Sequence, residues 1–121
     1  MKKLLLISAL LFSVNSYSQS IINAFAAQIG YWNTNTDKYD WEVTVRTNIT
    51  FTIQNGYVFT TDKNNSVYEV VSLESSNGKE GVWSATDELG DNCSIILKYN
   101  EDDSNIIAIV YDTFCVRYYF E

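Results

Sequence analysis

Apolar and polar residues alternate along the chain from residue 26 to the C-terminus, and no stretch repeats its apolar residues with the period of a helix. Alternation with a period of two is typical of strands that cover a core on one face. Because short strands separated by turns pair most simply with their neighbours, we expect an all-β fold, an antiparallel meander of about eight to nine short strands that forms a barrel or a sandwich. The predicted strands are residues 26–32, 39–46, 49–54, 57–61, 66–73, 81–86, 93–99, 106–111 and 114–120.

The dipeptide Asn55-Gly56 is the strongest hairpin signal in the chain. A type I′ turn needs positive φ at both central residues, which Asn and Gly tolerate best. A two-residue hairpin at this point places Gln54 opposite Tyr57 and Ile53 opposite Val58. The register therefore predicts that Val58 faces the core together with Ile53.

The same register turns Tyr57 and Phe59 to the opposite face, among threonines. Exposed aromatic side chains are frequent anchors of protein interfaces, and they offer apolar faces on which sugars can stack. If only one face of the sheet is covered, Tyr57 and Phe59 are candidate surface residues for binding a protein or a glycan.

The segment before this hairpin is predicted as one strand over residues 39–46 followed by a second over residues 49–54. The alternation places Trp41, Val43 and Val45 on one face of the first of these strands. Residues 19–25 lack a clear pattern and form either a short helical turn or an extra strand.

The N-terminus has the regions of a secretory signal peptide. Lys2 and Lys3 supply the basic region, and residues 4–14 are apolar apart from two serines, a stretch too short to span a bilayer as a helix. Ser16 and Ser18 place small side chains at the −3 and −1 positions of a cleavage site. We therefore expect cleavage after Ser18.

Cleavage there separates a signal peptide, residues 1–18, from a single all-β domain, residues 19–121, that is secreted or periplasmic. The formal net charge of the chain is −7, and the loss of two N-terminal lysines takes it to −9. Nucleic acid and anionic membrane surfaces are excluded as partners, because binding phosphate requires a basic face. The acidic charge favours solubility or attraction to a cationic partner. No later segment is long and apolar enough to hold the domain in a membrane as a helix.

The chain has no histidine. Histidine-dependent triads and ordinary zinc sites are thereby excluded, and no glycine-rich phosphate loop is present, so we predict no catalytic residue, no cofactor and no metal ligand. Acidic residues gather at 87–91 and 101–103, where solvated turns explain them better than a calcium site does. The neighbouring carboxylates of Asp87 and Glu88 leave open a small carbohydrate-active hydrolase.

In an exported protein, Cys93 and Cys115 are candidates for a disulfide bond. Both begin strands at the same end of the meander, with one strand between them. Two strand spacings separate their Cα atoms by about 9–10 Å, whereas a disulfide needs about 4.4–6.8 Å. A bend that brings them together and two separate, partly buried thiols both remain open.

Aromatic residues in and beside the first strands either fill the core or form a stacking platform for a sugar or a protein. The segment Gly30-Tyr31-Trp32, with Arg117 on the last strand, resembles lipocalin-like barrels, in which a basic residue of the last strand covers the indole of a Gly-x-Trp on the first. This resemblance implies a barrel, and it leaves open a carrier of small ligands. The aromatic residues in question are Tyr31, Trp32, Tyr39, Trp41, Tyr57, Phe59 and Trp83.

A second resemblance covers nearly all of residues 19–121 and implies an exported β-domain. The chain is similar to short exported proteins of Bacteroidota that have no assigned activity, so this resemblance implies no site residues. We expect a non-enzymatic domain that binds or inhibits a protein or a glycan. The second resemblance rests on residues 30–32, 41, 66–68, 83–87, 93–97 and 110–112.

Overall fold

The computed structural model describes residues 20–62, 65–77, 79–100 and 105–121. This part of the chain is an antiparallel all-β meander, as the alternation predicts. The predicted signal peptide and the acidic residues at 101–103 lie outside the described residues. The strands are β1 (Ser20–Asn33), β2 (Lys38–Trp41), β3 (Val45–Gln54), β4 (Tyr57–Thr60), β5 (Val67–Ser76), β6 (Glu80–Thr86), β7 (Asn92–Lys98), β8 (Asn105–Val110) and β9 (Phe114–Phe120).

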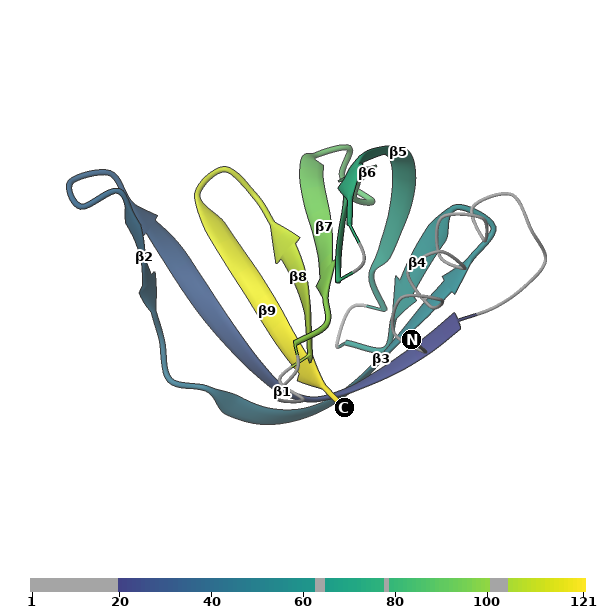
Figure 1. The fold of residues 1–121 in the computed structure, drawn as a ribbon, viewed down its shortest axis with the longest axis horizontal. Coiled ribbons are helices and arrows are strands. Elements are labelled where there is room, and N and C mark those ends of the chain that lie inside the picture. Colours follow the sequence, from purple (N-terminus) through teal and green to yellow (C-terminus); the bar gives the residue numbers. More distant parts are fainter. Residues whose placement is uncertain (1–19, 63–64, 78, 101–104) are drawn as a thin grey trace.

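The meander closes because β1 pairs along both of its edges (Figure 1). On one edge, its N-terminal half pairs with β3 and its C-terminal end pairs with β2. On the other edge it pairs with β9. β2 and β3 thus follow one another along the same edge of β1 and share one position in an eight-stranded closed barrel, so the barrel form of the predicted fold is confirmed.

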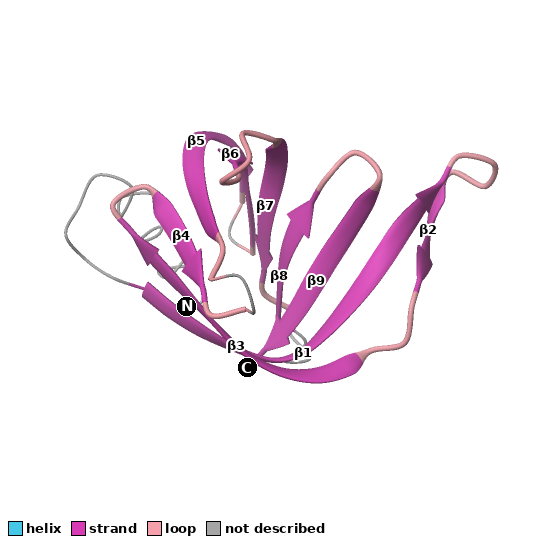
Figure 2. Cartoon of the chain, turned by 180° about the vertical axis from the view of Figure 1, so that it is seen from behind, coloured by secondary structure: helices cyan, strands magenta, loops and turns pink. Residues whose placement is uncertain are grey.

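The C-terminal end of β1 and the whole of β2 form a hairpin whose tip extends away from the other strands (Figures 1 and 2). Its register pairs Gly30 with Trp41 and Asn33 with Lys38. β2 stands at the end of the strand order, so its second edge carries no strand of the described chain. We refer to residues 28–42 as the β1–β2 arm.

β1 begins at Ser20, so residues 20–25 belong to a strand and not to a helical turn. The register of β1 shifts between Ala24 and Ala26, where a β-bulge interrupts the alternation. Ala24 and Ala26 are both buried, and Phe25 between them is exposed. A bulge bends its strand and increases the local twist, which helps one long strand to close a barrel.

The predicted strand over residues 39–46 is wrong in its extent, because β2 ends at Trp41 and β3 begins at Val45. Between them the backbone leaves the ladder, where the Glu42 carbonyl accepts a hydrogen bond of 2.7 Å from the Gln28 side-chain amide. Trp41 lies opposite Gly30 and Val45 lies opposite Ala27. Positions 27 and 30 of one strand face opposite ways, so Trp41 and Val45 lie on opposite faces and not on one.

The Asn55-Gly56 hairpin is confirmed. Both residues have positive φ, 54° and 82°, and Ile53 pairs with Val58 as predicted. Val58 is buried in the core, while Phe51, two positions before Ile53 on β3, is completely buried.

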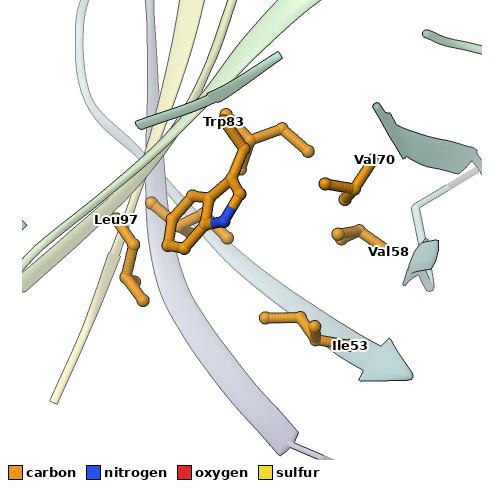
Figure 3. A pocket seen from close by; sticks show the side chains of 7 residues that line it. Ile53, Val58, Val70, Trp83 and Leu97 are labelled. Carbon is orange, nitrogen blue, oxygen red and sulfur yellow. The ribbon is translucent and has the colours of Figure 1, made fainter. Parts of the chain in front are cut away.

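The barrel interior is filled by apolar side chains. Phe51, Leu97 and Ile107 are the largest fully buried ones. The Trp83 indole lies among Leu97, Val70, Val58 and Ile53 (Figure 3). The space left beside this indole is about 30 Å³, lined by seven apolar residues, which is room for about two water molecules.

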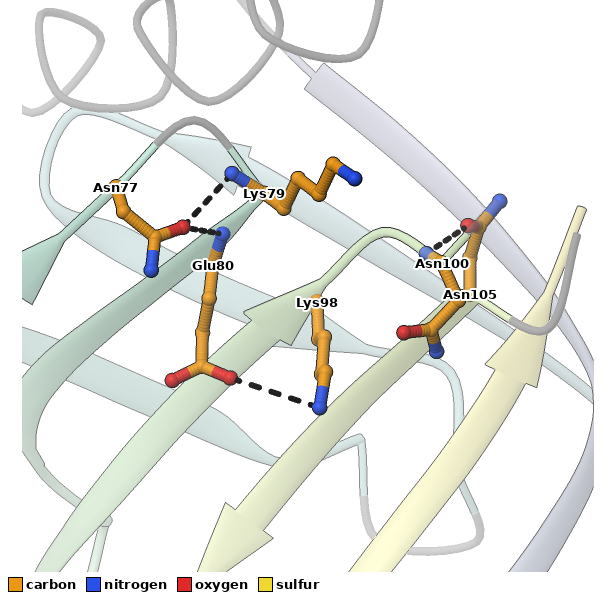
Figure 4. Close-up of polar contacts among 6 residues, drawn as sticks. All are labelled: Asn77, Lys79, Glu80, Lys98, Asn100 and Asn105. Atoms are coloured by element: carbon orange, nitrogen blue, oxygen red, sulfur yellow. Dashed lines mark hydrogen bonds and ion pairs between the residues drawn. The ribbon is translucent and has the colours of Figure 1, made fainter. Parts of the chain in front are cut away.

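Short polar contacts hold the barrel end where β5 turns into β6 and β7 leads toward β8 (Figure 4). The Asn77 side-chain oxygen accepts backbone hydrogen bonds from Lys79 (2.8 Å) and Glu80 (2.9 Å). The buried Asn105 side chain accepts the backbone N–H of Asn100 at 3.1 Å. These bonds satisfy turn backbone groups that would otherwise compete for water.

Candidate functional site

Aromatic side chains and one arginine gather on the outer face of the β1–β2 arm and the neighbouring strand β9. They come from three strands that the closure of the barrel brings together, β1, β2 and β9. We call this group the aromatic cluster. It consists of Trp32, Tyr39, Trp41, Arg117 and Tyr119.

The centre of the aromatic cluster is the contact between Arg117 and Trp41. The guanidinium carbon lies 3.5 Å from the centroid of the Trp41 ring and 5.8 Å from that of Tyr119. The indole lies flat on Gly30, where an added Cβ would come within 2.7 Å of it. Glycine at position 30 thus makes room for the ring, and the arginine covers the ring from the other strand.

Gln28 fixes the arginine in this position. Its side-chain oxygen accepts hydrogen bonds from Arg117 Nη2 (2.6 Å), Arg117 Nε (3.0 Å) and the Tyr119 hydroxyl (3.3 Å). Its amide nitrogen donates to the Glu42 carbonyl. Both ends of the Gln28 amide are thus hydrogen-bonded. Because the bond to the Glu42 carbonyl orients the amide, the amide oxygen in turn orients the guanidinium.

The rings of the aromatic cluster form a ridge, not a flat platform. Trp32 meets Tyr39 edge-to-face at 5.1 Å and 76°, and Tyr39 meets Trp41 at 5.3 Å and 42°. Trp32 is 40% exposed and Trp41 37% exposed. Such tilted neighbours stabilise each other and still leave apolar edges and faces to solvent.

Cys115 lies beneath this ridge. It pairs with Gly30 across β1 and β9 and is buried. Burial and the neighbouring Cys115 sulfur raise the pKa of the Tyr39 hydroxyl. The ridge therefore contains a neutral phenol and one fixed positive charge, that of Arg117.

The inner face of the same arm is also apolar and exposed. Ile29 and Tyr31 are 38% and 49% exposed, and Val45, which begins β3 beside the arm, is 57% exposed. The β3–β4 ladder covers only residues 51–54 of β3, so no strand pairs with the beginning of β3 on that side. Both faces of the arm thus offer apolar area to a partner, which is unusual for a strand pair of a monomeric barrel.

Tyr57 and Phe59, the predicted surface residues, lie on the outer face of β4. Both rings are exposed, at 40% and 41%, with centroids 6.0 Å apart. Phe59 is flanked by Thr52 on β3 and by Val67 on β5. They form a second, smaller aromatic surface that is separate from the aromatic cluster.

The acidic turn at 87–91 uses its carboxylates to hold itself together. Asp87 accepts hydrogen bonds from the Tyr111 hydroxyl (2.8 Å) and from the backbone N–H groups of Leu89 (3.0 Å) and Asp91 (2.9 Å). Burial alone would raise the pKa of Asp87, but these hydrogen bonds outweigh it and lower the pKa. Glu88 accepts the backbone N–H of Val67 at 2.7 Å. A glycosidase acid needs a raised pKa, whereas the pKa of Asp87 is lowered.

The two cysteines are free thiols in the structure. Cys93 belongs to the core, and Ser94, the next residue, is aligned through Val110 with Cys115. Successive residues of a strand face opposite ways, so the two thiols lie on opposite faces of the sheet with β8 between them. The alternative of a Cys93–Cys115 disulfide is therefore not observed.

The arginine-over-indole contact implied by the lipocalin resemblance exists with a different partner. Arg117 covers Trp41 of β2 and not Trp32 of β1. Trp83 is a core residue, whereas Trp32 and Trp41 are exposed, so the predicted aromatic set divides between core and surface.

One feature of the sequence indicates that Arg117 has a specific partner. Arg117 is the lone charged residue of β9, a strand that is otherwise apolar apart from its tyrosine hydroxyls. A charge in that position needs a partner nearby. The identity of the partners, Gln28 and Trp41, depends on the closure of β1 onto β9.

No protein-family model matches the chain, and neither curated proteins nor solved structures match it. Both resemblances therefore stay predictions. In the described ranges, no group of three or more potential ligands is placed to hold a metal ion. No helix among the described residues is long and apolar enough to cross a membrane.

Proposed function

We propose that this protein is an exported, non-enzymatic domain that binds a protein partner through the aromatic cluster of the β1–β2 arm. The observation that carries the proposal is the half-exposed ridge of Trp32, Tyr39 and Trp41, fixed by Arg117, on a hairpin that extends from the barrel. Trp, Tyr and Arg are the residues that most often supply the binding energy of protein interfaces.

The ring geometry favours a protein over a glycan. Sugar rings stack on open aromatic faces, but the Trp41 ring packs against Gly30 and has the Arg117 guanidinium 3.5 Å from its centroid. The rings of Trp32 and Tyr39 are nearly perpendicular. A ridge of this shape fits a groove or pocket in a protein surface better than it fits a flat sugar chain.

The two other functions left open by the sequence receive less support. A carrier barrel needs a cavity of several hundred cubic ångströms, and the space inside this barrel is about 30 Å³. A hydrolase based on Asp87 and Glu88 needs a carboxyl group with a raised pKa, and the pKa of Asp87 is lowered.

The test is capture of a partner by the mature protein from periplasmic and culture fractions, followed by calorimetry with the purified captured protein. We expect saturable binding that Trp32→Ala weakens by about 30-fold or more, because interface anchors contribute about 2 kcal/mol or more. The melting temperature of the variant is the control for folding. Equal affinity of Trp32→Ala and the unchanged protein would overturn the proposal, and so would binding of a purified glycan in place of a protein.

A further inference from the structure

We propose that two copies of this chain pair through the open edges of their β2 strands, antiparallel and centred on Tyr39. This inference concerns the edge of the β1–β2 arm and not its outer face, so it stands independently of the proposed partner. β2 is the last strand in the order of the sheet, and it forms the outer margin of the molecule (Figure 1). A second copy therefore reaches this edge without meeting another strand of the first.

The backbone of β2 directs specific groups toward this edge. The Trp32 N–H donates to the Thr113 carbonyl, toward β9, while the Ile29 carbonyl accepts from Glu42, toward β2. Along a strand the backbone groups of successive residues point to alternate edges. Tyr39, opposite Trp32, therefore points its N–H and carbonyl away from β1, where they can bond the same groups of a second copy.

The charges beside Tyr39 are self-complementary. In an antiparallel pair centred on Tyr39, Lys38 of each copy lies opposite Asp40 of the other. Both side chains are exposed, and the Asp40 carboxylate already accepts a hydrogen bond from Asn33 at 3.0 Å, which holds it beside the strand. Opposite charges directly across two strands stabilise their pairing, and like charges weaken it.

The same charges favour this register over the two that are centred on Asp40 or on Lys38. A shift in one direction places Asp40 opposite its own copy, and a shift in the other places Lys38 opposite its own copy. The register centred on Tyr39 avoids both repulsions. It also preserves the two faces of the sheet, so the aromatic clusters of the two copies lie side by side on one outer surface.

Short edge strands with charged residues normally resist such pairing. The net negative charge of the chain also makes two copies repel at long range. We therefore expect a weak dimer, whose population rises with protein concentration.

Charge reversal tests the pairing. Sedimentation equilibrium is measured at concentrations up to about 1 mM for the unchanged protein, for Lys38→Asp, for Asp40→Lys, and for the double exchange of both residues. Each single reversal converts both ion pairs of the dimer into repulsions, so the dissociation constant is expected to rise about tenfold or more. The double exchange restores complementarity and is expected to restore the dimer. Lys98→Asp, which lies on the barrel wall beside Glu80 and changes the net charge by the same amount as Lys38→Asp, is the matched control for that variant.

A backbone test is independent of charge. Tyr39→Pro removes the N–H that points to the open edge and no N–H that bonds β1. Tyr39→Ala removes the same ring and keeps the N–H. We expect the proline variant to be monomeric and the alanine variant to retain the dimer. A protein that is monomeric at all concentrations would overturn the proposal, as would a dimer unaffected by single charge reversal or not restored by the double exchange.

Discussion

The Arg117 guanidinium covers the Trp41 indole at 3.5 Å, joining the last strand of the barrel to the arm that extends from it. Gln28 of β1 receives both an Nε and an Nη2 hydrogen bond from the same guanidinium. One side chain therefore connects β9, β1 and β2. The half-exposed ridge owes its fixed shape to this contact.

Replacing Arg117 is expected to destabilise the protein. Arg117→Ala removes a cation–π contact of about 0.5–2 kcal/mol and two hydrogen bonds of about 1 kcal/mol each, so we expect the free energy of unfolding in urea to fall by about 2–4 kcal/mol. Arg117→Lys keeps the charge and loses the planar fork, so it should recover only part of the loss. The exposed Arg46 supplies the control, since Arg46→Ala should change stability by less than about 0.5 kcal/mol. Equal effects of the two alanine substitutions would contradict the role given to Arg117.

Two glycines that lie against tryptophans should respond differently to a methyl group. An added Cβ would come within 2.5 Å of Trp83 at Gly81 and within 2.7 Å of Trp41 at Gly30. Trp83 is 7% exposed and is enclosed by the core, whereas Trp41 is 37% exposed and needs only the Arg117 side chain above it to shift. Gly81→Ala should therefore cost about 1–3 kcal/mol, and Gly30→Ala should cost less while making a tryptophan more accessible to acrylamide. The reverse order in urea unfolding would show that the Trp41 position is the more constrained one.

The acidic turn predicts a pH dependence of stability. Because the pKa of Asp87 is lower in the folded protein than its ordinary value of 3.8, the ionised carboxylate stabilises the fold fully above that value. The stabilisation is lost as the pH falls below 3.8 toward the folded pKa. Asp87→Asn should be less stable than the unchanged protein at pH 7, with a smaller difference at pH 3. A difference that grows on acidification would refute this assignment.

The thiols should be inert in the folded protein. Burial is the main cause that raises the pKa of Cys93, to about 11, and Cys115 is buried beneath the aromatic cluster. Ellman's reagent at pH 8 should therefore react with neither thiol in the native protein and with both in denaturant, without any reductant. If no thiol reacts in denaturant, the two cysteines are bonded to each other, contrary to the structure.

Local sequence patterns predicted the fold correctly where a turn type alone sets the strand register. The Asn55-Gly56 turn determined the β3–β4 register, which pairs Ile53 with Val58 and buries Val58 in the core. The pattern failed where the backbone left the ladder, at the bulge after Ala24 and between Trp41 and Val45. Each irregularity reverses the faces of the residues that follow, and neither carries a glycine or proline that would reveal it.

The candidate site depends on contacts that are distant in sequence. The sequence identified Tyr57 and Phe59 because a local hairpin rule turns them outward, and both are exposed on β4. Arg117 and Gln28 are 89 positions apart, and only the pairing of β1 with β9 brings them together. No local periodicity indicates that pairing. The lipocalin resemblance therefore implied that Arg117 covers Trp32, whereas it covers Trp41.

Site-specific photo-crosslinking tests most directly whether the proposed partner contacts the aromatic cluster. Trp32→benzoylphenylalanine and Phe59→benzoylphenylalanine place the same reactive group on two exposed surfaces, at positions that are 40% and 41% exposed. With the captured partner present, irradiation should link the partner through position 32 and not through position 59. A cross-link through position 59 alone would place the interface on β4 and contradict the account.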